Sequence, residues 1–185
     1  MQQIDSDILM QCQRGDKEAF RWVVKTYQQM VFSLALKMLC DEEEAKDVVQ
    51  ETFIRVWQNI EEYDSRRSFV TWLYTITTRL CLDRLKGMRQ IVPLLDKDSA
   101  LREFASNTDN QRIIENREWV AIVRRLTNGL SEKQRLVFTL CQLEGLSSQE
   151  TEQITGMDAK QVKSNLYVAR QTIRKQLKAL GYEQD

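Results

Sequence analysis

Residues 147–180 read SSQETEQITGMDAKQVKSNLYVARQTIRKQLKAL, and this stretch predicts two helices joined by a tight turn. Ser147 followed three residues later by Glu150 is the pattern of a capping box at a helix start. Gly156 interrupts the first helix, and Asp158 can cap the second. In the second helix the apolar residues recur at spacings of three and four, which makes one apolar stripe. They are Val162, Leu166, Ala169, Ile173 and Leu177.

The second of these helices also concentrates positive charge. Between Asp158 and Lys178 six basic residues stand against one acidic residue, giving +5 in a chain whose net charge is zero. A polar arc separate from the apolar stripe carries Lys160, Lys163, Ser164, Tyr167 and Gln171. A helix with one buried face and one basic face, following a tight turn, suits the major groove of DNA. The alternative is a surface helix of a bundle whose basic face is only solvated.

The composition predicts a globular all-α protein. The 185 residues include 42% apolar and 29% charged residues, with six glycines and one proline, and helical periodicity recurs along the chain. No apolar run approaches the roughly 20 residues that span a bilayer, and the N-terminus has no secretory signal. We therefore expect a cytoplasmic protein without direct membrane insertion.

Nothing in the sequence supports catalysis or a bound cofactor. The chain contains no histidine, which removes the usual general base and many metal sites. Neither a glycine-rich phosphate loop nor a nucleophile elbow is present. The four cysteines lack zinc-ligand or disulfide spacing, which indicates a reducing compartment and small core residues. They are Cys12, Cys40, Cys81 and Cys141. We expect no enzyme activity, no cofactor and no metal.

Periodicity and breakers predict the other helices in two groups. The first group comprises helices near residues 7–14, 16–39, 42–60 and 69–88, with a polar loop at 63–68. The second group comprises helices near residues 111–128 and 131–143, followed by the pair already described. Residues 91–110 carry little pattern. The expected architecture is therefore two small helical domains joined by a flexible linker, with a helix-turn-helix in the C-terminal domain.

Two segments in this order resemble the bacterial RNA polymerase sigma factors of the extracytoplasmic-function (ECF) group. The first is DVVQETFIRVW (47–57) with FVTWLYTITTRLCLDRL (69–85), and the second is LSEKQRLVFTLCQLEGLSSQETEQITGMDAKQVKSNLYVARQTIRKQL (130–177). The resemblance implies sigma region 2 in residues 1–90, a linker in 91–110 and sigma region 4 in 111–185. It implies a transcription-initiation factor that binds core RNA polymerase and reads minus-10 and minus-35 promoter elements. The family also implies control by an anti-sigma factor, which is often anchored in the membrane.

The resemblance also implies three kinds of contact for particular residues. The expected contacts with core polymerase are Asp47, Gln50 and Glu51. The expected contacts with minus-10 DNA are Tyr63, Arg66, Arg67, Arg79 and Arg84. The expected contacts with minus-35 DNA are Lys160, Gln161, Lys163, Ser164, Tyr167 and Arg170. The chain departs from the family pattern at Arg79, where many relatives carry Asn, and at Asn165 and Val168, where Arg is common.

Two other classes of protein fit parts of the sequence. One is a helix-turn-helix regulator whose N-terminal domain senses a signal or dimerises, and the other is a helical adaptor that binds only proteins. Neither requires both segments of the resemblance. Only a sigma factor requires a polymerase-binding surface as well as DNA contacts.

Overall fold

The computed structural model describes residues 4–91 and 110–181, and every regular element in these residues is helical. The helices are α1 (Ser6–Gln13), α2 (Lys17–Leu39), α3 (Glu42–Asn59), η1 (Ile60–Glu62), α4 (Phe69–Ile91), α5 (Asn110–Thr127), α6 (Glu132–Phe138), η3 (Thr139–Leu143), α7 (Ser148–Thr155) and α8 (Ala159–Ala179). The predicted linker, 91–110, falls outside the described residues except at its two ends, where Ile91 is the last residue of α4 and Asn110 is the first residue of α5. The all-α prediction is confirmed, and the helix ends lie within a few residues of those expected.

Short polar side chains cap the helix starts. Asp16 accepts hydrogen bonds from the backbone N–H groups of Glu18 and Ala19, and Asp41 accepts one from Glu44. These contacts satisfy donors that the first helical turn leaves unpaired. None of the helices in residues 4–91 and 110–181 is long and apolar enough to cross a bilayer.

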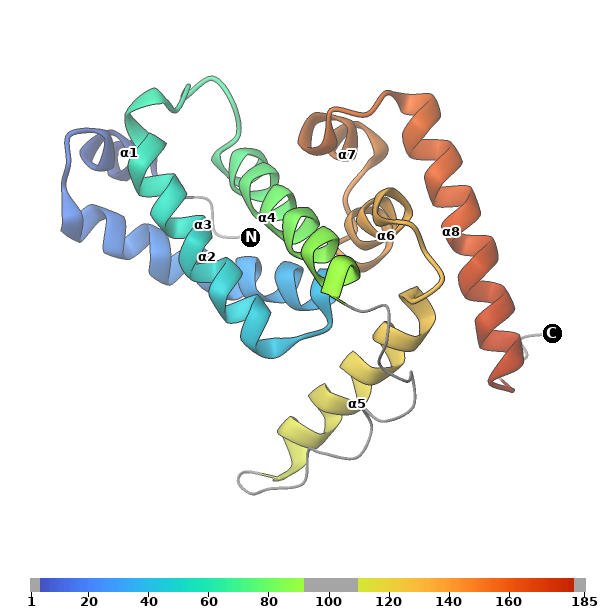
Figure 1. Ribbon diagram of the computed structural model, residues 1–185. Coiled ribbons are helices and arrows are strands. Elements are labelled where there is room, and N and C mark those ends of the chain that lie inside the picture. Colours follow the sequence, from blue (N-terminus) through green and yellow to red (C-terminus); the bar gives the residue numbers. More distant parts are fainter. Residues whose placement is uncertain (1–3, 92–109, 182–185) are drawn as a thin grey trace.

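Helices α1 to α4 pack around their own apolar core. Val23 and Val31 of α2, Val56 of α3 and Leu73 of α4 are fully buried in it. Aromatic rings extend this core toward the loop after η1, where Phe69 lies against Tyr27 and Trp72. The loop 63–67 lies at one end of this unit, between η1 and α4, and α4 runs from there along the unit (Figure 1).

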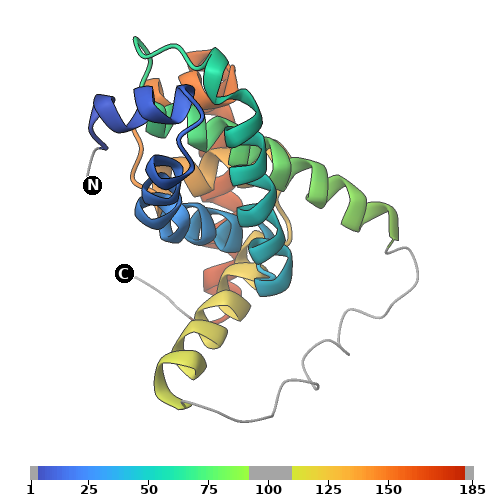
Figure 2. The ribbon, with the colours of Figure 1, turned by 90° about the vertical axis from the view of Figure 1, so that its left-hand side faces the viewer.

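The C-terminal helices share a second core with the N-terminal ones. Leu136, Leu140 and Ile154 pack in the same cluster as Leu34 and Tyr74. Figures 1 and 2 show α4 beside α6 and α7, with α8 on the far side of this layer. The sequence predicts two domains but gives no sign of this contact between them.

Candidate nucleic-acid interface

The turn between α7 and α8 is built as its residues predict. Gly156 ends α7 in the left-handed region (φ 70°, ψ 9°), and its N–H donates to the carbonyl of Glu152 at 2.8 Å. A residue without a side chain adopts this conformation at little cost. Asp158 then caps α8 by accepting from the N–H of Gln161 at 2.8 Å. Ser147 and Glu150 form the predicted capping box at the start of α7.

Helix α8 buries one side and leaves its basic side exposed. Val162 and Ala169 are fully buried, and Ile173 is nearly so, because α8 packs on α6 and α7. The opposite side exposes Lys160, Lys163, Ser164 and Tyr167, whose ring is 64% exposed. The structure therefore brings these four predicted contacts together on one open face. Val168, one of the departures from the family pattern, is 40% exposed beside them.

The other two predicted minus-35 residues have partners within the chain. The side-chain oxygen of Gln161 accepts from the backbone N–H of Asp158 at 3.1 Å, completing a capping box. Arg170 donates from Nε to Oε1 of Gln142 on η3 at 3.2 Å. Both side chains are exposed, but a DNA contact by either would compete with these hydrogen bonds.

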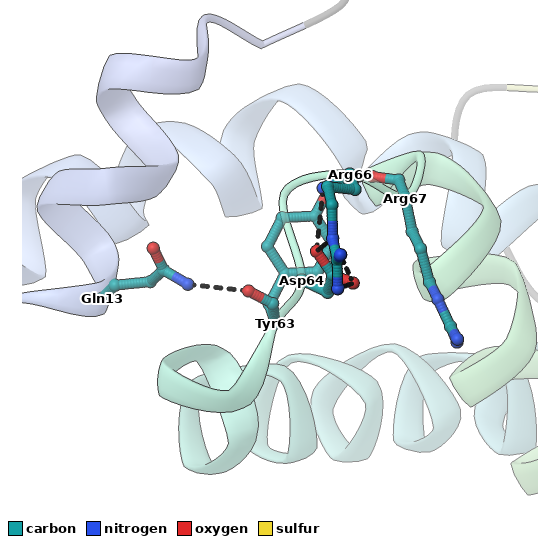
Figure 3. A network of polar contacts seen from close by, with 5 residues as sticks. All are labelled: Gln13, Tyr63, Asp64, Arg66 and Arg67. Carbon is teal, nitrogen blue, oxygen red and sulfur yellow. Dashed lines mark hydrogen bonds and ion pairs between the residues drawn. The ribbon is translucent and has the colours of Figure 1, made fainter.

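The loop 63–67 is organised by Tyr63, which is only 9% exposed (Figure 3). Its ring lies 5.1 Å from that of Trp72 and 5.4 Å from that of Phe69, between ring centroids. Its hydroxyl donates to the carbonyl of Arg67, and its own carbonyl accepts from Nε2 of Gln13 at 2.9 Å. Burial raises the pKa of the Tyr63 phenol. In this conformation Tyr63 anchors the loop, and its ring is not open to a base.

The two arginines of the loop point outward with different partners. Arg66 donates from Nε and Nη2 to the two carboxylate oxygens of Asp64, each at 2.9 Å. This fork lowers the pKa of Asp64 to about 2. Arg67 is exposed in the same loop, and its guanidinium extends away from the Arg66–Asp64 pair (Figure 3).

Of the two predicted arginines on α4, one is exposed and the other is paired with a carboxylate. Arg79 is exposed on the helix surface. Arg84 is half-buried, and its Nη1 lies 2.8 Å from Oε2 of Glu44 on α3. The Arg84–Glu44 pair ties α4 to α3, so this guanidinium already has an acidic partner within the N-terminal unit.

The predicted polymerase residues lie along one side of α3. Asp47 and Gln50 are exposed, while Glu51 is half-buried and pairs with Arg55 one turn later at 2.9 Å. Gln50 also lies on the rim of a groove of about 840 Å³ between α2 and α3. Apolar side chains including Phe20, Phe53 and Trp57 line this groove. Helical periodicity alone cannot tell an apolar side chain that lines a groove from one that is buried in the core.

The cysteines and acidic residues of the described segments form no metal site. No cluster of three or more ligand side chains occurs in residues 4–91 and 110–181. Cys12, Cys40 and Cys81 are buried, and burial raises the pKa of each thiol. These thiols are therefore small core residues rather than ligands or reactive groups.

A helix-turn-helix with an open basic face, joined to a helical unit with an acidic helix and exposed arginines, defines a helical DNA-binding protein with a second interaction module. The family pattern described as Sigma-70 region 2 matches residues 23–90, and Sigma-70, region 4 matches residues 121–173. The chain belongs to the sigma-70 family, in its ECF group. It is a sigma factor that binds core RNA polymerase and directs promoter-specific transcription initiation.

Curated relatives match over nearly their whole length. The ECF RNA polymerase sigma factor SigW of Bacillus subtilis is 31% identical over 193 residues, covering 93% of this chain and 96% of the relative. The RNA polymerase sigma-H factor of Pseudomonas aeruginosa is 30% identical, covering 97% and 96%. The ECF RNA polymerase sigma-E factor of Escherichia coli K12 is 31% identical, covering 95% of each chain.

Two solved structures share the fold at lower identity. CnrH in complex with the cytosolic domain of CnrY matches with a TM-score of 0.69 at 23% identity, covering 93% of this chain and 96% of that one. The sigma factor RpoE of Bartonella quintana, in complex with the anti-sigma factor NepR, matches with a TM-score of 0.65 at 21% identity, covering 86% and 96%.

Proposed function

We propose that the two helical units divide the work of initiation between them. Residues 1–90 act as sigma region 2 and residues 111–185 as sigma region 4. The side of α3 that carries Asp47, Gln50 and Glu51 binds core polymerase. The loop 63–67 and α4 bind the opened minus-10 element, and α8 reads the minus-35 element. The protein acts in the cytoplasm and catalyses no reaction.

The observation that carries this proposal is the open basic face of α8 in a chain that matches both sigma regions. Lys160 and Lys163 supply positive charge for phosphates or base edges, and Ser164 and Tyr167 supply neutral hydrogen-bonding groups. The neighbouring Asn165 and Val168 add no charge where relatives often carry Arg. We therefore expect fewer phosphate contacts and a weaker dependence of binding on salt than in those relatives.

Opening of the minus-10 element draws its free energy from contacts that the duplex cannot make. The exposed guanidinium groups of Arg66, Arg67 and Arg79 are suited to the backbone or bases of an unpaired strand. Stacking of an extruded base on Tyr63 requires this ring to leave Phe69 and Trp72. We infer that the arginines make the first contacts and that any use of Tyr63 follows a rearrangement of the loop.

Similar proteins of known structure bind other proteins. Two solved structures that share this fold are complexes, one with the cytosolic domain of CnrY and one with an anti-sigma factor. We infer that an anti-sigma factor controls this chain also. Any link to a membrane would come from that partner.

The test of the proposed function is run-off transcription from a genomic promoter library with purified core polymerase. We expect transcripts that start at defined sites only when this chain is added, and a shared two-part motif upstream of those sites. Retained DNA binding without any co-migration with core polymerase and without transcripts would instead identify a helix-turn-helix regulator. If Lys163→Ala and Tyr167→Ala leave every activity of the chain intact, the chain would instead be a protein-binding adaptor.

Lys163 gives a sharper prediction for the minus-35 contact. Lys163→Ala is expected to weaken binding to the preferred minus-35 sequence by about 1–3 kcal/mol if the ammonium group donates to a base edge. Binding measured on the preferred duplex and on variants at each base position tests this role. The matched control is Lys17→Ala, which removes the same charge from an exposed position on α2. An equal loss on every sequence would show a phosphate contact instead.

A further inference from the structure

Glu144 is a nearly buried charged side chain at the contact between the two helical units. It follows η3 directly, and its side chain is only 8% exposed. Its Oε1 accepts from Nζ of Lys37 on α2 at 2.6 Å, and its Oε2 accepts from the hydroxyl of Tyr74 on α4 at 2.8 Å. Both carboxylate oxygens of one C-terminal residue are therefore bound by N-terminal side chains.

The local backbone explains how Glu144 reaches this position. Residues 139–143 form a π-helical turn, and the N–H of Glu144 donates to the carbonyl of Thr139 at 2.9 Å. The wider turn carries one more residue than an α-helical turn and ends α6 beside α2. Lys37 also donates to the carbonyl of Leu143 at 3.3 Å, so it binds this turn at two points.

A second set of contacts crosses the interface at the C-terminus of α2. The last carbonyl groups of a helix lack partners within the helix. Here Arg135 of α6 donates to the carbonyl of Met38 at 3.1 Å, and Arg124 of α5 donates to that of Cys40. Positive side chains at this end also suit the helix dipole. The interface thus combines directed polar contacts with the apolar cluster of Leu34, Tyr74 and Leu140.

This docked arrangement conflicts with reading both promoter elements at once. The conflict rests on the proposed division of the two elements between the two units. Elements near positions −35 and −10 lie about 25 base pairs apart, or roughly 85 Å at about 3.4 Å per base pair. A compact chain of 185 residues has a radius of gyration of about 16 Å. The two units must separate before α8 and α4 can occupy both elements.

We propose that Glu144, held by Lys37 and Tyr74, is the latch of a closed state of this sigma factor that cannot occupy both promoter elements. In the closed state the latch holds the two units in one relative position. In the open state water and the promoter complex replace these contacts. The free chain therefore carries its own restraint on promoter binding, separate from any inhibitory partner.

The chemistry of the latch suits a contact that must open. A buried ion pair adds little net stability, because the loss of hydration offsets much of the attraction between the charges. Removing one partner nevertheless leaves the other buried and unpaired, which disfavours the docked state strongly. An interface built from apolar side chains alone would expose a large apolar surface to water after opening. Lys37, Tyr74 and Glu144 are instead hydrated when they separate.

Solution scattering of the full chain tests the latch without reference to transcription. The wild-type chain is expected to show the radius of gyration of a compact particle. Glu144→Gln is expected to raise the ratio of open to closed chains on the order of tenfold, because it removes the charge that both donors bind. The matched control is Glu62→Gln, which makes the same change at an exposed position on η1 and is expected to stay compact.

Charge exchange tests whether Lys37 is the partner that matters. Lys37→Glu and Glu144→Lys are each expected to open the chain, and the double variant is expected to close it again. Tyr74→Phe keeps the ring and removes the hydrogen bond, so it is expected to open the chain less than Glu144→Gln. If circular dichroism shows that Glu144→Gln is unfolded, Tyr74→Phe replaces it as the test of the latch. Three results would each overturn the proposal: an open wild-type chain, a compact Glu144→Gln chain, or a double variant as open as the single ones. If Glu144→Gln does not fold, a fully compact Tyr74→Phe chain takes the place of the second result.

A second readout connects the latch to polymerase. If the closed state limits assembly, the open variant is expected to need up to about tenfold less protein for half-maximal run-off transcription, since the apparent affinity scales with the competent fraction. Opening seen by scattering without this gain would overturn the restraint on promoter binding. Absence of transcription from every variant, including the wild type, would overturn the proposed function and leave the scattering result unaffected.

Discussion

Replacing Asp47 and Glu51 together by lysine is expected to weaken binding of core polymerase by on the order of 2–4 kcal/mol while the helices stay folded. Reversing charges at a complementary interface replaces attraction with repulsion and slows the encounter as well. Asp47 is exposed and Glu51 half-buried along one side of α3. The Glu51–Arg55 pair is lost, but surface pairs one helical turn apart contribute only about 0.3–0.5 kcal/mol.

The control for this charge reversal must change the net charge equally. Glu61→Lys with Glu62→Lys does so at two exposed positions on η1. Affinity for core polymerase, measured at two salt concentrations, is expected to fall much further for the α3 pair than for the η1 pair. Equal losses in the two double variants would mean that net charge, and not this side of α3, controls the association.

The helices were predictable because their starts, ends and buried sides depend on neighbours within about four residues. Ser147 and Asp158 cap helices in the structure as the sequence predicts, and the structure adds caps of the same kind at Asp16 and Asp41. Gly156 interrupts the helical pattern in the sequence and ends α7 in the structure, where its φ is positive. A local feature that periodicity missed is the π-helical turn at 139–143, because one extra residue hardly changes the apolar pattern.

The open face of α8 was also predictable, whereas the environment of other site residues was not. Lys163 and Tyr167 lie on a face that helical geometry defines once Val162 and Ala169 are known to be apolar. The burial of Tyr63 and the pairing of Arg84 with Glu44 depend on side chains that are distant in the sequence or in another element. The assigned roles of these residues in DNA binding remain predictions.

The contact between the two units could not be predicted from sequence patterns. Lys37 and Glu144 are separated by 107 residues, and nothing in the sequence pattern around either residue pairs it with the other. Leu34 and Leu140 read as core residues of their own helices, and nothing in their spacing shows that they share one cluster. Periodicity predicts that a side chain is buried but not which other element covers it.

Val162→Asp is expected to unfold the helices of the C-terminal unit and to abolish minus-35 binding. Val162 is 0% exposed, and it packs where α8 meets the preceding helices. A carboxylate there is removed from water, and an unpaired buried charge costs on the order of 3–5 kcal/mol. That loss is a large part of the roughly 5–15 kcal/mol that stabilises a folded protein. Thermal unfolding followed by circular dichroism is expected to show a melting temperature lower by about 10 °C or more.

The matched variant lies six residues further along the same helix. Val168→Asp makes the same chemical change at a side chain that is 40% exposed, so the carboxylate stays hydrated and the fold is expected to be retained. It places a negative charge beside Lys163 and Tyr167 on the face proposed to meet DNA, so minus-35 binding is expected to weaken, although less than in Val162→Asp. The two variants thus separate burial from DNA contact on one helix. Similar melting temperatures for both would contradict the packing of α8, and undiminished DNA binding by a folded Val168→Asp chain would contradict the assignment of this face to the promoter.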